Sequence, residues 1–229
     1  ALEGEQLLSL AAAYGVTLRY SAAVGGALPA LERISRARSD GPIRSFSGVL
    51  NGTTNYVLDQ LAAGKDFASA VAAAQKAGYA EADPRFDLNG TDAAQKLILL
   101  ARQAFGVCLP LAAVEREGID QLEPQLVSKA KDAGLTVRLI ASCRQEADGL
   151  KASVKPMMLS LSDTFASVKD VENRLMIEPV AGPPSVVSGK GAGRWPTSES
   201  VVADLLDIRR ELQQAHAVES FEDSAECVA

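Results

Sequence analysis

Four carboxylates and a lysine occupy one short stretch, GYAEADPRFDLNGTDAAQK, between Gly78 and Lys96. Asp92 and Lys96 are four residues apart, so on a helix they lie about 40° apart around the axis and within reach of each other. Their apolar neighbours, Ala93–Ala94 and Leu97–Ile98, leave little room for a solvated surface. A lysine in apolar surroundings loses stabilisation of its charge and can act as a base. The pair predicts proton-transfer chemistry or, as the simpler alternative, a surface ion pair worth about 0.3–0.5 kcal/mol.

The other acids of this stretch, Glu81, Asp83 and Asp87, come just before that helix, on a segment expected to be a loop. Loops are where binding groups tend to lie. Carboxylates that face one pocket repel each other unless a cation arrives, which is either a substrate ammonium group or a metal ion. DLNGTD resembles a calcium loop only faintly, because its acids do not fall at the required spacing. Simple capping of helices and turns is the alternative, and Asp83 before Pro84 is typical of a turn.

Two glycine-containing segments precede expected helices. NGTTN (51–55) offers backbone N–H groups at a helix start, which is an anion site, although capping by Asn51 or Thr53 is the simpler interpretation. GKGAG (189–193) does not have the spacing of a phosphate-binding loop. No GxGxxG follows a strand anywhere in the sequence, so no dinucleotide fingerprint is present.

The composition excludes several other classes of protein. The net charge is -6 without clustered Lys or Arg, so a nucleic-acid partner is not expected. Arg, Gly and Pro interrupt the most apolar windows, so no membrane span is expected, and the first residues do not resemble a signal peptide. Three cysteines and a single histidine, His216, exclude a His–Cys zinc site and disfavour a Ser–His–Asp triad. A reduced, cytoplasmic setting fits best, and acid–base chemistry must depend on Asp, Glu, Lys or Tyr.

The elements that must position these residues alternate irregularly between helix and strand, which predicts an α+β fold with a mixed sheet. Helices are expected at 3–14, 31–38, 56–63, 67–77 with Asp66 as its cap, 92–106, just after Pro110, 124–133 and 199–215. Strands are expected at 16–24, 43–50, 135–143, 150–159 and 173–180. Loops are expected at 79–91 and 189–197, and a flexible tail from His216 onwards.

Four segments together resemble one known family. YSAAVGGALP, GVLNGTTNYVL, AQKAGYAEADPRFDLNGTDAAQKLILLA and GAGRWPTSESVVADLLD, in this order, are similar to the catalytic portion of homoserine dehydrogenase. The resemblance covers residues 1–212, and the long acidic block is its most specific part. It implies a mixed β-sheet with helices on one face, and a remnant of a Rossmann-type domain at the termini.

The resemblance also implies an activity and a set of site residues. Enzymes of this family interconvert homoserine and aspartate 4-semialdehyde with NAD or NADP, in the biosynthesis of the aspartate family of amino acids, including threonine and methionine. Lys96 and Asp92 would be catalytic, with Lys96 polarising the reacting oxygen. The implied substrate-binding residues are Glu81, Asp87, Thr53, Gly52 and Tyr79, and the implied cofactor-binding residues are Gly189, Gly191 and Gly193.

YSAAVGGALP resembles a monovalent-cation site, for an ion such as sodium, built from backbone carbonyls. The implied carbonyls are those of Ser21, Val24, Gly26 and Leu28. Ser21 stands where the family has a glutamate, which weakens this expectation. Arg194 and Trp195 are also bulkier than the family pattern.

The resemblance divides the chain into three parts. Residues 1–24 are expected to be the C-terminal edge of a missing nucleotide-binding domain, 25–190 the catalytic and dimerisation domain, and 191–229 a glycine-rich loop, a returning helix and the tail. The chain alone is therefore expected to be inactive, and a homodimer is expected through the strands after residue 134. Two alternatives stay open: a non-catalytic amino-acid-binding or dimerisation domain, and a related dehydrogenase with a different substrate.

Overall fold

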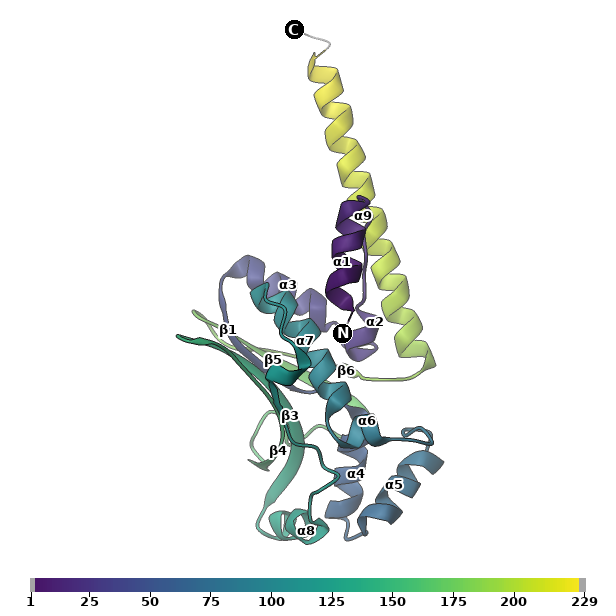
Figure 1. The fold of residues 1–229 in the computed structure, drawn as a ribbon, viewed down its shortest axis with the longest axis vertical. Coiled ribbons are helices and arrows are strands. Elements are labelled where there is room, and N and C mark those ends of the chain that lie inside the picture. The colour runs from purple at the N-terminus through teal and green to yellow at the C-terminus, as the bar shows by residue number, and fades with distance from the viewer. Residues whose placement is uncertain (1–2, 227–229) are drawn as a thin grey trace.

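The fold is α+β, as predicted, and consists of a six-stranded mixed sheet with helices packed on one face (Figure 1). The computed structural model describes the backbone of residues 3–226 and the side chains of residues 3–214. The strands are β1 (Ile43–Val49), β2 (Val114–Arg116), β3 (Leu135–Glu146), β4 (Gly149–Ser160), β5 (Glu172–Pro179) and β6 (Ser185–Lys190). The helices are α1 (Gly4–Ala13), α2 (Ala22–Gly25), α3 (Ala30–Asp40), α4 (Gly52–Ala62), α5 (Phe67–Lys76), α6 (Arg85–Leu88), α7 (Thr91–Phe105), the 3₁₀ turn η1 (Leu111–Ala113), α8 (Pro124–Asp132) and α9 (Arg194–Glu226).

The sheet has the strand order β2-β4-β3-β1-β5-β6. All neighbours are antiparallel except β2, which pairs with β4 in parallel. β1 lies in the interior of the sheet between β3 and β5, and its Phe46 points into the main core while Ser45 and Ser47 belong to the other face. Leu50 and the NGTTN segment, which follow the end of β1, therefore lie in the middle of the molecule.

Helices α3, α4, α7 and α8 cover one face of the sheet and close the main core. α7 is the helix predicted from the apolar run after Asp92, and it buries a stripe of apolar residues that includes Leu97, Leu100 and Ala101. The opposite face is covered only in part, by the segment 161–171, whose Phe165 and Val168 form a small second cluster. This asymmetry leaves part of the second face of the sheet open.

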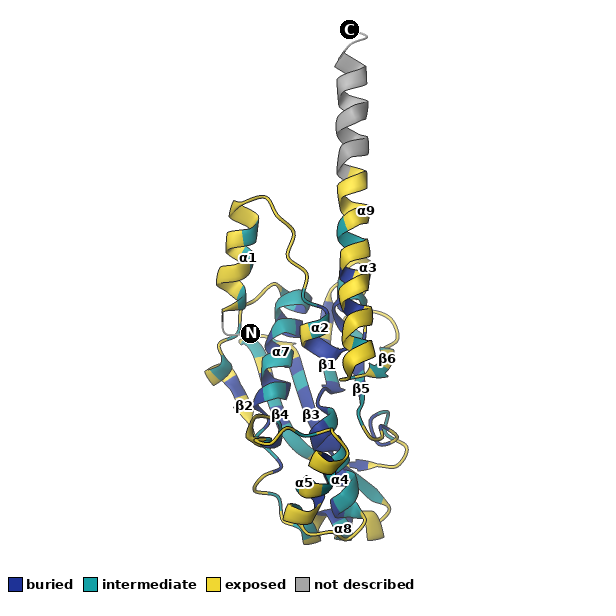
Figure 2. Ribbon diagram, turned by 90° about the vertical axis from the view of Figure 1, so that its right-hand side faces the viewer, coloured by how far each residue is buried: buried dark blue, intermediate teal, exposed yellow. Residues whose placement is uncertain are grey.

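α1 and α9 extend from one end of the body, and most of their described side chains are exposed (Figures 1 and 2). α1 contains no buried residue, and its Leu7 and Leu10 are exposed, as is Tyr14 just after it. α9 is attached near its start, where the backbone N–H of Ser21 donates to Asp204. Both helices therefore present unpartnered apolar side chains. No helix within the described residues is long and apolar enough to cross a membrane.

The strand predicted at 16–24 is wrong. Val16–Tyr20 has no regular structure, and the short helix α2 follows it. The sequence VTLRY has strand propensity, but a strand needs a neighbour for its ladder hydrogen bonds, and no strand of the described sheet lies beside it. Local propensity was therefore not sufficient here.

Several predicted boundaries also move. α4 begins at Gly52 rather than Tyr56, because Asn51 caps it, and the expected loop 79–91 contains the single turn α6. Two strands were missed: the short β2, and β6, which includes part of the expected loop 189–197. α9 starts at Arg194 and runs through most of the tail that was predicted to be flexible; residues 227–229 lie outside the described residues.

Candidate active site

Lys96 and Asp92 form an ion pair in the first two turns of α7, with 2.8 Å between Nζ and Oδ2. The Lys96 side chain is only 16% exposed, and its ammonium also donates to the carbonyl of Leu50 at 3.0 Å. Asp92 lies in the first turn of the helix, where the helix dipole favours negative charge. The pair is therefore partly buried and tied to the end of β1, so the alternative of a solvated surface pair is wrong.

Asn51 joins this pair to a second carboxylate. Its Nδ2 donates to Asp87 Oδ1 at 2.6 Å and to Asp92 Oδ2 at 2.7 Å. The other end of the same amide caps α4, because Oδ1 accepts the backbone N–H of Thr54 at 2.8 Å. The sequence interpretation treated Asn51 only as a cap. An asparagine cap presents a spare amide donor, and this was the available signal for its second role.

Asp87 has a perturbed ionisation. Burial raises the pKa of its carboxyl group above the ordinary value, and the nearby charge of Asp92 adds to this, while the hydrogen bond from Asn51 opposes it. The site therefore contains two carboxylates of which one is reluctant to ionise. Because Asp92 is already paired with Lys96, a cationic group that arrived beside Asp87 would favour the charged form of Asp87.

Thr53 and Gly52 lie at the start of α4, beside this cluster. The Thr53 hydroxyl donates to the carbonyl of Tyr79 at 2.7 Å, which ties the acidic segment to α4. Tyr79 in turn packs edge-on against Tyr56, with ring centroids 5.0 Å apart. A side chain on Gly52 would put Cβ 2.8 Å from Cα of Val171, so only glycine fits at this position. The structure thus brings together Asp87, Asp92 and Lys96, and places Thr53 and Gly52 alongside.

Glu81 is not joined to this cluster. Its side chain is exposed, and its carboxylate makes no hydrogen bond or ion pair with any residue that the structure describes. The neighbouring Asp83 is also exposed and pairs with Arg85 at 2.5 Å, which fits the turn interpretation. Glu81 as a substrate-binding residue stays a prediction.

The glycine-rich segment 189–193 packs against the segment 25–28 and leads directly into α9. The N–H of Ala27 donates to the carbonyl of Lys190 at 3.0 Å, and a Cβ on Gly189 would lie 2.7 Å from the carbonyl oxygen of Ala27. Gly189 lies in β6, Gly191 follows it, and Gly193 has a positive φ of 125° just before α9. Close backbone packing explains Gly189, and a role for these glycines at a cofactor stays a prediction.

Most of the carbonyls expected to hold a monovalent cation already accept hydrogen bonds. Ser21 accepts from the N–H of Val24, Leu28 accepts from the N–H of Ala30, and Gly26 accepts from the hydroxyl of Ser200. No group of three or more His, Cys, Asp or Glu suited to a metal occurs in the described part of the chain. The geometry therefore lends the expected ion no support.

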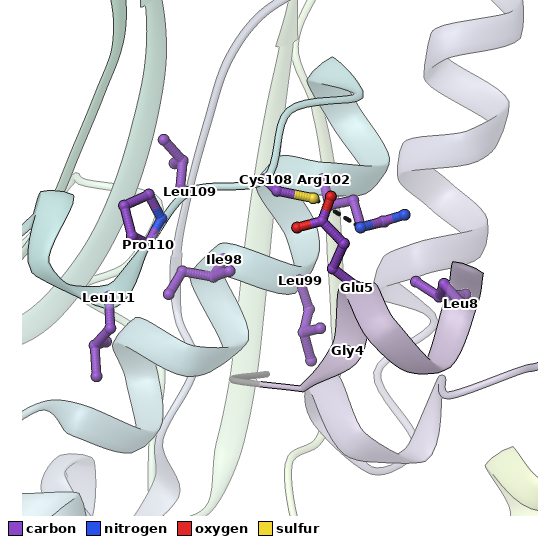
Figure 3. A pocket seen from close by; sticks show the side chains of 10 residues that line it. All are labelled: Gly4, Glu5, Leu8, Ile98, Leu99, Arg102, Cys108, Leu109, Pro110 and Leu111. Atoms are coloured by element: carbon purple, nitrogen blue, oxygen red, sulfur yellow. Dashed lines mark hydrogen bonds between the residues drawn. The ribbon is translucent and has the colours of Figure 1, made fainter. Parts of the chain in front are cut away.

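A cavity of about 350 Å³ lies between α1 and α7, away from the Lys96 cluster (Figure 3). Its lining is mainly apolar, from Leu8, Ile98 and Leu99, and its polar contact joins Arg102 to Cys108. It contains none of the carboxylates around Lys96. The cavity marks the loose packing of α1 on the body and is not the candidate site.

The fold and the cluster together define an α+β domain with a partly buried group of charged side chains at the junction of a sheet and the N-termini of two helices. A family model for homoserine dehydrogenase matches residues 29–206. The chain therefore belongs to the homoserine dehydrogenase family.

Individual relatives agree with this assignment. A homoserine dehydrogenase of Pseudomonas aeruginosa is 36% identical over 211 residues, which cover 92% of this chain and 49% of that protein. One from Neisseria gonorrhoeae is 33% identical over 218 residues, covering 94% of this chain and 50% of that protein. A solved structure from Thiobacillus denitrificans superposes with a TM-score of 0.88 at 34% identity, covering 93% of this chain and 49% of its own. The chain thus spans about half the length of these relatives.

Proposed function

We propose that this chain forms the substrate half of an NAD- or NADP-dependent homoserine dehydrogenase, which interconverts homoserine and aspartate 4-semialdehyde. The observation that carries the proposal is the partly buried cluster of Lys96 and Asp92, bridged by Asn51 to Asp87, in a chain of this family. A nicotinamide cofactor, when bound, would take up or supply the hydride. The remaining steps depend on the residues of this chain.

In the proposed site the carboxylates bind the substrate ammonium group. Asp87 is half-buried, and its raised pKa makes it reluctant to ionise. A cation beside it would therefore favour its charged form. Glu81, exposed on the same segment, would complete the binding of the ammonium group. Thr53, Gly52 and Tyr79 would line the pocket. These interactions hold the amino acid with its oxygen towards α7.

Lys96 would act on the reacting oxygen. Its ammonium has three donors, of which one is directed to Asp92 and one to Leu50, so one is left for the substrate. In the reduction direction the Lys96 ammonium would donate a proton to the carbonyl oxygen as the hydride arrives and would become the neutral amine. In the oxidation direction the neutral amine would accept the hydroxyl proton as the hydride leaves. Asp92 holds the lysine in place and balances its charge.

We further propose how the parts of the chain are used. Residues 25–190 would form the catalytic and dimerisation domain, with a homodimer through the open face of the sheet. Residues 1–24 and 191–229 would border a nucleotide-binding half, which the exposed apolar side chains of α1 and α9 support. The free thiols of Cys108 and Cys143 are consistent with a reducing, cytoplasmic location. The monovalent cation stays a prediction.

Titration calorimetry on residues 1–229 tests the substrate assignment without the cofactor. We expect L-homoserine to bind, and Asp87→Ala to abolish the heat of binding. Asp83→Ala is the matched control, because Asp83 is exposed and paired with Arg85 outside the cluster. Absence of homoserine binding to a folded chain, combined with no activity in the complete enzyme, would overturn the proposal.

A second function is favoured by one observation: Lys96, Asp87, Asp92 and Asn51 are all assembled within this chain. The chain could therefore serve as a non-catalytic amino-acid-binding domain. Binding of homoserine with no oxidation in the complete enzyme would select this alternative.

A further inference from the structure

The carbonyl of Leu50 accepts hydrogen bonds from two side chains that are distant in sequence. One donor is Lys96 Nζ at 3.0 Å, and the other is Asn173 Nδ2 at 3.1 Å. Asn173 lies in β5, next to the end of β1, and is 0% exposed. The anchor of the proposed proton-transfer residue is thus shared with a fully buried amide.

The other side of the Asn173 amide faces the glycine-rich segment. A Cβ added to Gly191 would lie 2.2 Å from Nδ2 and 2.4 Å from Oδ1 of Asn173. Gly191 is held there because its N–H donates to the carbonyl of Val171 at 3.0 Å. The amide is therefore enclosed between the end of β1 and the backbone of residue 191.

The burial of the Asn173 amide leaves one of its polar atoms without a hydrogen bond to any described residue, which is energetically unfavourable. Its Oδ1 is buried and has no hydrogen-bond partner among the described residues. A buried polar atom without a partner is normally avoided, and an apolar side chain would fill the same space. The one strong interaction of the amide is its hydrogen bond to Leu50, so this bond is the physical reason for an asparagine at this position.

We propose that Asn173 is a positioning residue for Lys96, and that Gly191 lacks a side chain so that this amide can reach Leu50. A carbonyl oxygen has two lone pairs, and Asn173 occupies one of them. This fixes the direction of the other, which binds the ammonium of Lys96. The inference depends on the proposed function only where it names Lys96 as the proton-transfer group.

Lysine labelling with an acetylating reagent, read residue by residue by mass spectrometry, tests the positioning in residues 1–229. In Asn173→Leu we expect Lys96 to be labelled about 2- to 10-fold faster, the release expected for one lost hydrogen bond. The exposed Lys65 and Lys76 serve as internal references and should keep their rates. A general loss of structure would raise the labelling rates of many lysines together. The ratio of the Lys96 rate to the rates of the reference lysines therefore distinguishes a loss of positioning from a loss of stability.

Gly191→Ala is the second variant, because the atoms nearest to its added methyl group are those of the Asn173 amide, which it must displace. Gly191→Ala should also increase the labelling rate of Lys96. The control Ala192→Ser, at an exposed neighbouring position, should leave that rate unchanged. If Asn173→Leu does not fold, Asn173→Ser replaces it in the same comparison. Unchanged Lys96 labelling in the folded Asn173 variant and in Gly191→Ala would overturn the proposal.

A kinetic comparison in the complete enzyme adds a second measurement. Asn173→Leu should lower kcat while KM for homoserine stays nearly constant, because the carboxylates that bind the substrate are untouched. A change in KM alone would contradict the positioning role. Homoserine binding to the chain depends on Asp87 and not on Asn173, so failure of this inference leaves the proposed function intact.

Discussion

Asn51 donates to Asp87 across 2.6 Å, and this hydrogen bond connects the start of α4 to the acidic segment before α7. The same side chain donates to Asp92 and caps α4. One amide therefore holds together three elements that are separate in sequence. Its loss should affect both the stability of the fold and the placement of the carboxylates.

Replacement of Asn51 by aspartate separates these two roles. Asn51→Asp keeps a capping oxygen for Thr54 but removes the donor and places three carboxylates together. We expect the free energy of unfolding to fall by about 1–3 kcal/mol, the usual result of leaving buried polar groups unsatisfied. Urea unfolding at pH 7 measures this. Asp66→Asn keeps the cap of α5 at an exposed site and serves as the control; an equal effect in both variants would show that capping alone matters.

Asp87 should make stability depend on pH with a definite sign. Its pKa is raised in the folded state, mainly by burial, so the folded chain holds this proton more tightly than the unfolded chain. Stability therefore falls as pH rises from the ordinary value of 3.8 through the raised folded pKa. Asp87→Asn should melt at a higher temperature than the parent at pH 7, and the difference should vanish below pH 3.8. Thermal unfolding from pH 3 to pH 7 checks this.

Asp66 provides a control of opposite sign for this pH series. A hydrogen bond from the Ser69 hydroxyl lowers the pKa of Asp66, so its contribution is present at neutral pH and is lost as pH falls below 3.8. Asp66→Asn should therefore lower the melting temperature at pH 7 and have less effect in acid. If Asp87→Asn followed the same direction as Asp66→Asn, the assigned environment of Asp87 would be wrong.

The two described cysteines should differ sharply in reactivity. Burial raises the pKa of the Cys143 thiol to about 12, whereas Cys108 is exposed. Because the thiolate is the reactive form, iodoacetamide at pH 8 should alkylate Cys108 and leave Cys143 unmodified until the chain is unfolded in urea. Peptide mass spectrometry distinguishes the two sites. Rapid alkylation of Cys143 in the folded chain would contradict its placement in the core.

The sequence predicted most of the helices and strands and the pairing of Asp92 with Lys96, because both depend on short-range patterns. The spacing of Asp92 and Lys96 within an apolar helix was enough to predict their pairing. The strand at 16–24 failed because strand formation depends on partners that are distant in sequence. Asn173 could not have been found in the same way, since its role depends on the pairing of β5 with β1 and on the close approach of Gly191.

Dimerisation through the open face of the sheet can be tested with two adjacent methionines of β4. Met157 and Met158 are 47% and 58% exposed, and alternation places them on opposite faces. Met157 borders a hollow on the open face together with Ser47, Ser142 and Met176. Met157→Asp should weaken the dimer at least about 100-fold, because burying an unpaired charge costs several kcal/mol.

Met158→Asp is the matched control for the dimer, since it adds the same charge at a neighbouring exposed position on the other face. Light scattering over a range of chain concentrations measures both variants against the parent. A monomeric parent, or equal weakening by the two substitutions, would exclude the open face as the interface. A symmetric dimer is expected, because two-fold symmetry dominates among homodimers.

Lys96 and Asp87 should separate catalysis from binding in an enzyme assembled from this chain and the nucleotide-binding half proposed above. Lys96→Ala removes the only group of the cluster that can donate a proton while charged, so kcat should fall by about 10²–10⁴-fold, the usual effect of a positioned acid–base group. KM for homoserine should change much less. Asp87→Ala should instead raise KM more than it lowers kcat, because it removes a partner of the substrate ammonium group. Steady-state oxidation of homoserine measures both variants.

The control for Lys96→Ala is Lys151→Ala, which removes a lysine that is also paired with a carboxylate, Glu146, but lies on the surface. Exposed ion pairs contribute little, so this variant should keep the kinetics of the parent. Near-normal turnover in Lys96→Ala would mean that the ammonium held between Asp92 and Leu50 only stabilises the fold. In that case the free energy of unfolding would fall while kcat per folded molecule stayed constant, and the acid–base role would pass to another group.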